Sequence, residues 1–218
     1  MVGTGQFITF EGIEGCGKST QATRLAGWLS AQNIATSLEK EPGYGSIGAQ
    51  IRSILLSTDH HHMDPWCEAL LYLADRVQHL QEFVAPRLAE GTWVLCDRFH
   101  DSSLAYQGMA RGLGEDKLSA ILDWAHPQTR PHLSFLFDLD PEQALARARD
   151  RNDNCPVAAK EGRFEQLEMA FHHKVRAAFQ TLAAREPNRF AIISAEGSAD
   201  AVFARVLSVF QDRYPHVR

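Results

Sequence analysis

The chain has 218 residues, of which 44% are hydrophobic, so it can enclose one sizeable core and we expect a single domain over residues 1–218. Its charge is mixed and mildly acidic, with 22 Lys and Arg against 27 Asp and Glu, which argues against a uniformly basic nucleic-acid-binding surface. We therefore expect no nucleic acid as a partner. There is neither a signal-peptide pattern nor an apolar stretch long enough to span a bilayer, so we expect no membrane as a partner either.

Five short runs rich in apolar or β-branched residues predict the strands of the fold. They are residues 6–10, 35–39, 92–97, 132–139 and 189–194. Helical patterns lie between these runs, and parallel strands that alternate with helices are joined by crossover connections. The sequence therefore predicts an α/β fold, with a five-stranded, mostly parallel sheet covered by helices on both faces.

The clearest helical pattern runs over residues 64–90, where Asp64 followed by Pro65 is a typical start signal. Apolar residues then recur at spacings of three and four and form one stripe. The stripe consists of Leu70, Leu73, Val77, Leu80 and Val84. This pattern predicts a helix face that packs either on the core or on a second copy of the chain.

Residues 12–19 fit the pattern GxxxxGK[ST], directly after the first predicted strand and before a helical pattern. Glycines allow a tight turn that points backbone N–H groups inward, and the helix adds its positive N-terminal end, so polyphosphate is held mainly by main chain. Lys18 is expected to reach the β- and γ-phosphates of ATP and Ser19 to ligate Mg²⁺. A glycine-rich turn without nucleotide is the alternative, but it leaves the lysine and serine unexplained. The expected ATP-binding residues are Gly12, Ile13, Glu14, Gly15, Cys16, Gly17, Lys18, Ser19 and Thr20.

Asp97 and Arg98 follow the third predicted strand, at the carboxyl end where ligands of open α/β sheets bind. There Asp97 can hold Mg²⁺ through water or orient an acceptor, and Arg98 can grip a phosphate bidentately. The alternative is helix capping with a surface ion pair.

Two further groups lie on predicted helices. Tyr72 and Arg76 are one turn apart, so one side chain can stack on a base while the other meets a phosphate, although an ordinary amphipathic helix face shows the same spacing. Near residue 150, several arginines precede a polar segment and can form a mobile cover that stabilises the moving phosphoryl group and excludes water, unless they only decorate a solvated helix. These arginines are Arg147, Arg149, Arg151 and Arg163.

The combination of motifs resembles thymidylate kinase of the bacterial type, within the nucleoside monophosphate kinase group of P-loop proteins. The resemblance is carried by residues 10–15, by Glu41-Pro42-Gly43, by Asp97-Arg98 with Tyr106-Gln107-Gly108, and by residues 138–151. It implies transfer of the ATP γ-phosphoryl group to dTMP, giving dTDP, with Mg²⁺, in a P-loop NTPase fold that forms a homodimer. An acceptor-binding region is expected at about 41–112 and a lid at about 147–165.

By the same resemblance, Glu14 faces the dTMP sugar, Arg76 and Arg98 contact its phosphate, Tyr72 lies at the thymine, and Tyr106 excludes a ribose 2′-hydroxyl. The full set of acceptor-binding residues implied is Glu14, Glu41, Pro42, Tyr72, Arg76, Arg98, Ser103, Tyr106 and Gln107. Tyr44 departs from the family, since many bacterial members have a glycine there, and residues 152–161 form a longer insert in the lid.

Yeast- and human-like members carry a catalytic arginine inside the P-loop, whereas this loop has none, so the resemblance shifts that charge to the lid. The catalytic residues implied are Lys18, Asp97, Arg98, Arg149 and Arg151. The metal ligands implied are Ser19, Asp97 and Glu165.

Two rival functions remain at this level. The first is a P-loop kinase for another nucleotide or a deoxynucleoside, and the second is a GTPase-like switch, although the chain has no NKxD or TKxD run for guanine recognition. Four cysteines without a CxxC pair indicate free thiols in a reducing compartment, so we expect a cytoplasmic protein.

Overall fold

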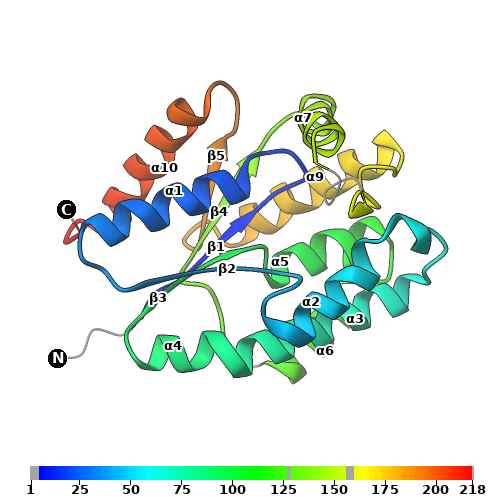
Figure 1. Cartoon of the computed structure of the whole chain (residues 1–218), viewed down its shortest axis with the longest axis horizontal. Helices are drawn as coiled ribbons and strands as arrows, with labels where there is room; N and C mark the ends of the chain where they lie inside the picture. The colour runs from blue at the N-terminus through cyan, green and yellow to red at the C-terminus, as the bar shows by residue number, and fades with distance from the viewer. Residues whose placement is uncertain (1–4, 127–128, 156–159, 218) are drawn as a thin grey trace.

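The computed structural model describes residues 5–126, 129–155 and 160–217, and its centre is one five-stranded sheet (Figure 1). All strand pairs are parallel, in the order β2-β3-β1-β4-β5. The strands are β1 (Phe7–Glu11), β2 (Thr36–Lys40), β3 (Trp93–Asp97), β4 (Leu133–Asp138) and β5 (Phe190–Ser194). Each predicted strand is confirmed to within one residue at either end, and so is the α/β class.

The inner strands are hydrophobic because helices cover both of their faces. Every residue of β1 is buried, and Phe10 packs against Phe135 and Phe137 of β4 at ring distances of 5.6 and 6.1 Å. Helices α1 and α10 pack together on one side of the sheet, while α4 and α9 contact strands β3 to β5 from the other (Figure 1).

The α-helices are α1 (Lys18–Ala31), α2 (Gly45–Leu56), α3 (Pro65–His79), α4 (Ala85–Ala89), α5 (His100–Ser103), α6 (Glu115–Ala125), α7 (Pro141–Asp153), α9 (Met169–Arg185) and α10 (Ala199–Arg213). A 3₁₀ turn, η1 (Thr58–His60), and two π-helical stretches, η2 (Leu80–Val84) and η3 (Leu104–Ala110), complete the described elements. Within the described ranges, no helix combines the length and apolar character needed to cross a membrane.

The predicted helix over residues 64–90 is present as α3, η2 and α4 in direct succession. Its start signal is confirmed, since the Asp64 carboxylate accepts the Trp66 backbone N–H at 2.8 Å. The apolar stripe, however, does not mark one buried face. Leu80 is buried, but Leu70 is 54% exposed, and the inward face of α3 carries Arg76 and His79 instead. The inward face of α3 is polar, and not apolar as predicted, because a polar pocket lies on that side of the helix.

Candidate active site

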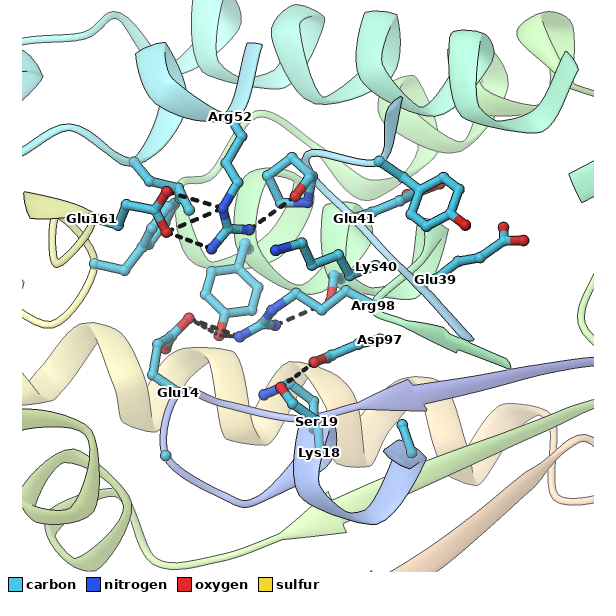
Figure 2. Close-up of a pocket in the computed structure, with 18 of the residues that line it drawn as sticks. Glu14, Lys18, Ser19, Glu39, Lys40, Glu41, Arg52, Asp97, Arg98 and Glu161 are labelled. Atoms are coloured by element: carbon cyan, nitrogen blue, oxygen red, sulfur yellow. Dashed lines mark hydrogen bonds and ion pairs between the residues drawn. The ribbon is translucent and has the colours of Figure 1, made fainter. Parts of the chain in front are cut away.

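A pocket of about 730 Å³ opens at the carboxyl ends of β1, β2 and β3 (Figure 2). Its lining comes from the loop before α1, from the end of β2, from α2 and α3, from the end of β3, from η3, and from α7 with the segment after it. Parallel strands that end at one edge collect ligand-binding loops there, as expected for an open α/β sheet.

The loop between β1 and α1 forms the floor of the pocket. Gly12, Gly15 and Gly17 have φ angles of +136°, +74° and +94°, a region that other residues rarely adopt. Lys18 opens α1, is only 6% exposed, and its Nζ donates to the Ile13 carbonyl at 2.7 Å. A glycine loop that leads into a helix N-terminus with a buried lysine is an anion site.

Replacement of Gly15 by alanine is expected to lower the free energy of unfolding by about 1–3 kcal/mol. A Cβ there would lie 1.8 Å from the Ala144 carbonyl oxygen, and the backbone has a positive φ as well. Gly27 is the matched control, because it is exposed in the middle of α1 with nothing within 4 Å of an added Cβ. Gly27→Ala is expected to raise the same free energy by about 0.5–1 kcal/mol. Urea denaturation measures both, and equal effects would contradict the close approach of the loop to α7.

Ser19 and Asp97 meet between the loop and the end of β3, where the serine hydroxyl donates to Asp97 Oδ2 (Figure 2). The second oxygen, Asp97 Oδ1, is buried and has no hydrogen-bond partner among the described residues. Hydroxyl and carboxylate oxygens are the ligands that Mg²⁺ takes in nucleotide sites, usually with several waters retained. The residues present therefore fit this ion.

Arg98 is held in one orientation by the groups around it. Its φ of +71° is rare for a residue with a side chain and costs on the order of 1–3 kcal/mol. The guanidinium donates to the Gly12 carbonyl at 3.0 Å and to Ser102 Oγ at 3.2 Å. It also donates to Glu14 Oε1 at 2.9 Å (Figure 2). A strained arginine directed into a pocket is suited to gripping a small anion.

Glu14 is the acidic residue of the loop and points toward η3. Burial alone would raise the pKa of its carboxyl, but the Arg98 charge, the nearby His172 ring, the Lys18 charge and the Tyr106 hydroxyl together hold that pKa below its usual range. The Tyr106 hydroxyl donates to Glu14 Oε1 at 2.7 Å. Glu14 therefore stays ionised and can accept a hydrogen bond from a ligand hydroxyl.

Arg76 is 1% exposed and yet lines the pocket. Its Nε donates to Glu41 Oε2 at 2.7 Å, Nη1 to Ser103 Oγ at 2.8 Å, and Nη2 to the Phe99 carbonyl at 2.9 Å. A guanidinium has five N–H bonds, so two remain for a ligand. The fixed geometry makes this arginine a preorganised donor beside Arg98.

Aromatic rings line the side of the pocket next to Tyr106. The Phe164 ring lies edge-on to Tyr106 at 5.5 Å and also faces Tyr72 at 6.5 Å. Gln107 is 2% exposed, and its amide donates to Glu68 Oε1 at 2.9 Å. This side therefore combines flat apolar surfaces with an oriented amide, which suits a planar base.

The helix α7 supplies further arginines to the pocket. Arg147 and Arg151, one turn apart, line the pocket, and Arg151 Nη2 donates to Glu165 Oε1 at 2.9 Å. Arg149 is exposed and lies outside the lining formed by the described residues, because a residue two positions away on a helix faces a different direction. The structure thus separates Arg149 from Arg151, which the sequence pairs as catalytic. Glu165, predicted as a metal ligand, lines the pocket and accepts from Arg151 in this structure.

Two interactions hold residues 160–165 against α2: a hydrogen bond from Arg163 and an ion pair of Glu161. Arg163 is 4% exposed and donates to the Leu55 carbonyl at 2.6 Å, which places it inside the protein and outside the described pocket lining. The Glu161 carboxylate accepts from Arg52 at 2.7 Å, and Arg52 also donates to the Pro42 carbonyl at 2.9 Å (Figure 2). The lid segment is thereby joined to the acceptor side. Of its predicted insert, 156–159 lie outside the described residues.

A sequence model of the thymidylate kinase family matches residues 10–206. The chain belongs to the thymidylate kinase family. A thymidylate kinase of Syntrophotalea carbinolica is 46% identical over 200 residues, which are 92% of this chain and 92% of that protein. A thymidylate kinase of Geobacter sulfurreducens is 44% identical over 211 residues, 97% of this chain and 99% of that protein. A solved structure, thymidylate kinase from Ehrlichia chaffeensis, superposes with a TM-score of 0.75 at 29% identity and covers 95% of this chain and 99% of its own.

Most residues predicted for a thymidylate kinase site line one pocket in this structure. They are Glu14, Gly15, Gly17, Lys18, Ser19, Thr20, Glu41, Pro42, Tyr72, Arg76, Asp97, Arg98, Ser103, Tyr106, Gln107, Arg151 and Glu165. Three other residues of the loop are buried and lie outside the lining that the described residues form: Gly12, Ile13 and Cys16. Their position suits shaping the phosphate loop of a thymidylate kinase rather than touching a ligand with their side chains.

Sequence reasoning missed several pocket residues, among them Glu39, Lys40 and Arg52. Glu39 and Lys40 end β2 at the pocket edge, and charged residues at the carboxyl end of a predicted strand are a signal that could have found them. Arg52 offers no such signal, because its partner Glu161 is 109 residues away in the chain.

Proposed function

We propose that this protein transfers the γ-phosphoryl group of ATP to dTMP, giving dTDP, and that it does so as one domain over residues 1–218. The observation that carries the proposal is one pocket that joins two anion grips. The loop with Lys18 lines this pocket together with Arg98, which follows β3, and Arg76 of α3. Membership of the thymidylate kinase family selects dTMP among acceptors.

On the donor side, backbone N–H groups of the glycine loop and the N-terminus of α1 hold the ATP phosphates. Lys18 presents its ammonium group to the phosphate that is transferred. Ser19 and Asp97 supply the oxygens for Mg²⁺, which when bound neutralises charge on the phosphate oxygens and orients them.

On the acceptor side, Arg98 and Arg76 hold the dTMP phosphate in line with the donor, and Glu14 accepts a hydrogen bond from the sugar 3′-hydroxyl. The aromatic surfaces of Tyr72 and Phe164 enclose the base. A phosphate monoester is largely ionised near neutral pH, so the reaction needs no strong general base and Asp97 serves as an organiser.

A panel of acceptors tests this function in an assay that couples ADP release to a spectroscopic signal. We expect turnover with dTMP to exceed turnover with thymidine, CMP and AMP by about 10²-fold or more in kcat/KM, because the acceptor grip requires a phosphate and the base site a thymine. The ratio of kcat/KM for dTMP to kcat/KM for dUMP reports how strongly the 5-methyl group of thymine is recognised. Preferred phosphorylation of another acceptor would overturn dTMP, and GTP hydrolysis without any acceptor would restore the GTPase-like switch.

We also propose a homodimer and a cytoplasmic location. Two apolar pairs support the dimer, since Ile47 and Ile54 on α2 are 47% and 43% exposed and Trp66 and Leu70 on α3 are 37% and 54% exposed. Residues spaced by four or seven share one helix face. A monomer in sedimentation at micromolar concentration would refute the dimer.

The cysteines all lie in the described part of the chain and are free thiols, as cytosolic reductants keep them.

A further inference from the structure

Behind Arg76 lies a chain of charged side chains that the proposed mechanism does not use. Arg76 Nε donates to Glu41 Oε2 at 2.7 Å, Glu41 Oε1 lies 2.8 Å from His79 Nδ1, and His79 Nε2 lies 2.6 Å from Glu39 Oε2. Arg87 donates to the other oxygen of Glu39. The side chains of His79 and Glu39 are fully buried, and those of Glu41 and Arg76 are almost so. The glutamates come from the β2 end of the pocket (Figure 2).

The geometry around His79 favours a doubly protonated ring. Each ring nitrogen faces a carboxylate oxygen at hydrogen-bond distance, and an ionised carboxylate can only accept. A neutral imidazole has one donor, so its other nitrogen would oppose a buried carboxylate lone pair. Burial lowers the pKa of His79, but the hydrogen bonds to Glu39 and Glu41 outweigh burial and raise that pKa to about 9.

The surroundings of His79 keep water out and place one further carboxyl group, that of Asp75, near the ring. The Tyr44 ring packs 5.2 Å from the imidazole, so the residue that departs from the family pattern covers this chain of charges. On α3, burial and the Glu41 charge raise the pKa of Asp75 to about 7, and on β3 burial raises the pKa of the Cys96 thiol. With His79 protonated, three cations alternate with two carboxylates along this chain, so each carboxylate lies between two cations.

The orientation of Arg76 therefore depends on Glu41, and that of Glu41 on His79. We propose that His79 is a positioning residue of the acceptor site: as an imidazolium it fixes the Glu41 carboxylate and so directs the two remaining N–H bonds of Arg76 at the acceptor phosphate. This inference rests on the proposed function, because it assumes that the acceptor carries a phosphate.

Steady-state kinetics of His79→Asn and His79→Gln test the proposal. Each amide has one donor nitrogen and one acceptor oxygen, so it can donate to one glutamate but not to both, and it carries no charge. We expect the KM for dTMP to rise about tenfold or more, with the KM for ATP within about twofold, because binding is lost on one side of the pocket only. His173→Gln is the matched control, since that histidine is on α9, is half exposed, and pairs with Glu142 at 3.1 Å. It should leave every constant within about twofold of the parent value.

A merely structural histidine would change both KM values and kcat together, or only the stability, and that result would overturn the proposal. A wild-type enzyme that phosphorylates dTMP while the His79 variants retain the parent KM for dTMP would refute the positioning role and leave the function standing. Failure of the wild type to use dTMP would instead refute the function.

Two measurements on the unaltered enzyme decide the matter if the variants do not fold. Nitrogen-15 spectra of histidine-labelled protein at pH 7.5 should show one buried ring with both nitrogens protonated, and a neutral ring in every buried histidine would overturn the proposal. The KM for dTMP should rise between pH 8 and 10, as the proton on His79 is lost near its pKa of about 9, while the KM for ATP changes little. Parallel changes in both KM values would count against the proposal.

Discussion

Replacement of Lys18 by alanine is expected to lower kcat by roughly 10²- to 10³-fold and to leave the fold intact. The ammonium group is only 6% exposed and is held over the loop by the Ile13 carbonyl, so it adds positive charge where the transferred phosphoryl group gathers negative charge. We expect the variant to stay folded, because alanine is a good helix former and continues α1.

The comparison uses Lys117→Ala, an exposed lysine of α6 outside the described pocket lining, which should retain the parent kcat. Coupled assays at saturating ATP and dTMP measure turnover, and circular dichroism with urea titration confirms that both variants are folded. Near-normal turnover in the Lys18 variant would remove the basis for assigning the phosphate loop.

The fold was predictable because its signals are local. Each strand is a short apolar run, and β1 and β4 are buried along nearly their whole lengths, so the composition of each run reports its place in the sheet. The phosphate loop was predictable for a related reason, since Gly12, Gly15 and Gly17 all have positive φ angles and the motif lists the residues that this backbone demands.

What the sequence could not give is which long-range partners each charged residue finds. Periodicity assigns the inward face of α3 to leucines, yet Arg76 and His79 are turned inward because Glu41 and Glu39, 35 to 40 residues earlier, lie across from them. Patterns within one helix do not contain that information. The same limit applies to Arg163, which looks like a lid residue in sequence and is bound to Glu68 at 2.8 Å in the interior.

The lid arginines give the second large effect, and there the structure separates residues that the sequence treats alike. Arg151→Ala is expected to lower kcat by roughly 10²- to 10³-fold. The phosphate loop, residues 12–19, has no arginine of its own, so the lid must provide the positive charge near the transferred group. Arg151 faces the pocket and its Nη2 is oriented by Glu165 at 2.9 Å.

Arg149→Ala is the matched control in the same helix and should keep kcat within about twofold of the parent, because Arg149 lies two positions from Arg151 on the helix and outside the described pocket lining. Single-turnover kinetics separate the chemical step from product release, so a loss confined to Arg151→Ala would place the charge at the transfer itself. Equal losses in the two variants would show that α7 rotates when ligands bind and that Arg149 enters the pocket. If both variants retain the parent kcat, the positive charge at the transferred group would be assigned to Arg147, the remaining arginine of α7 that lines the pocket.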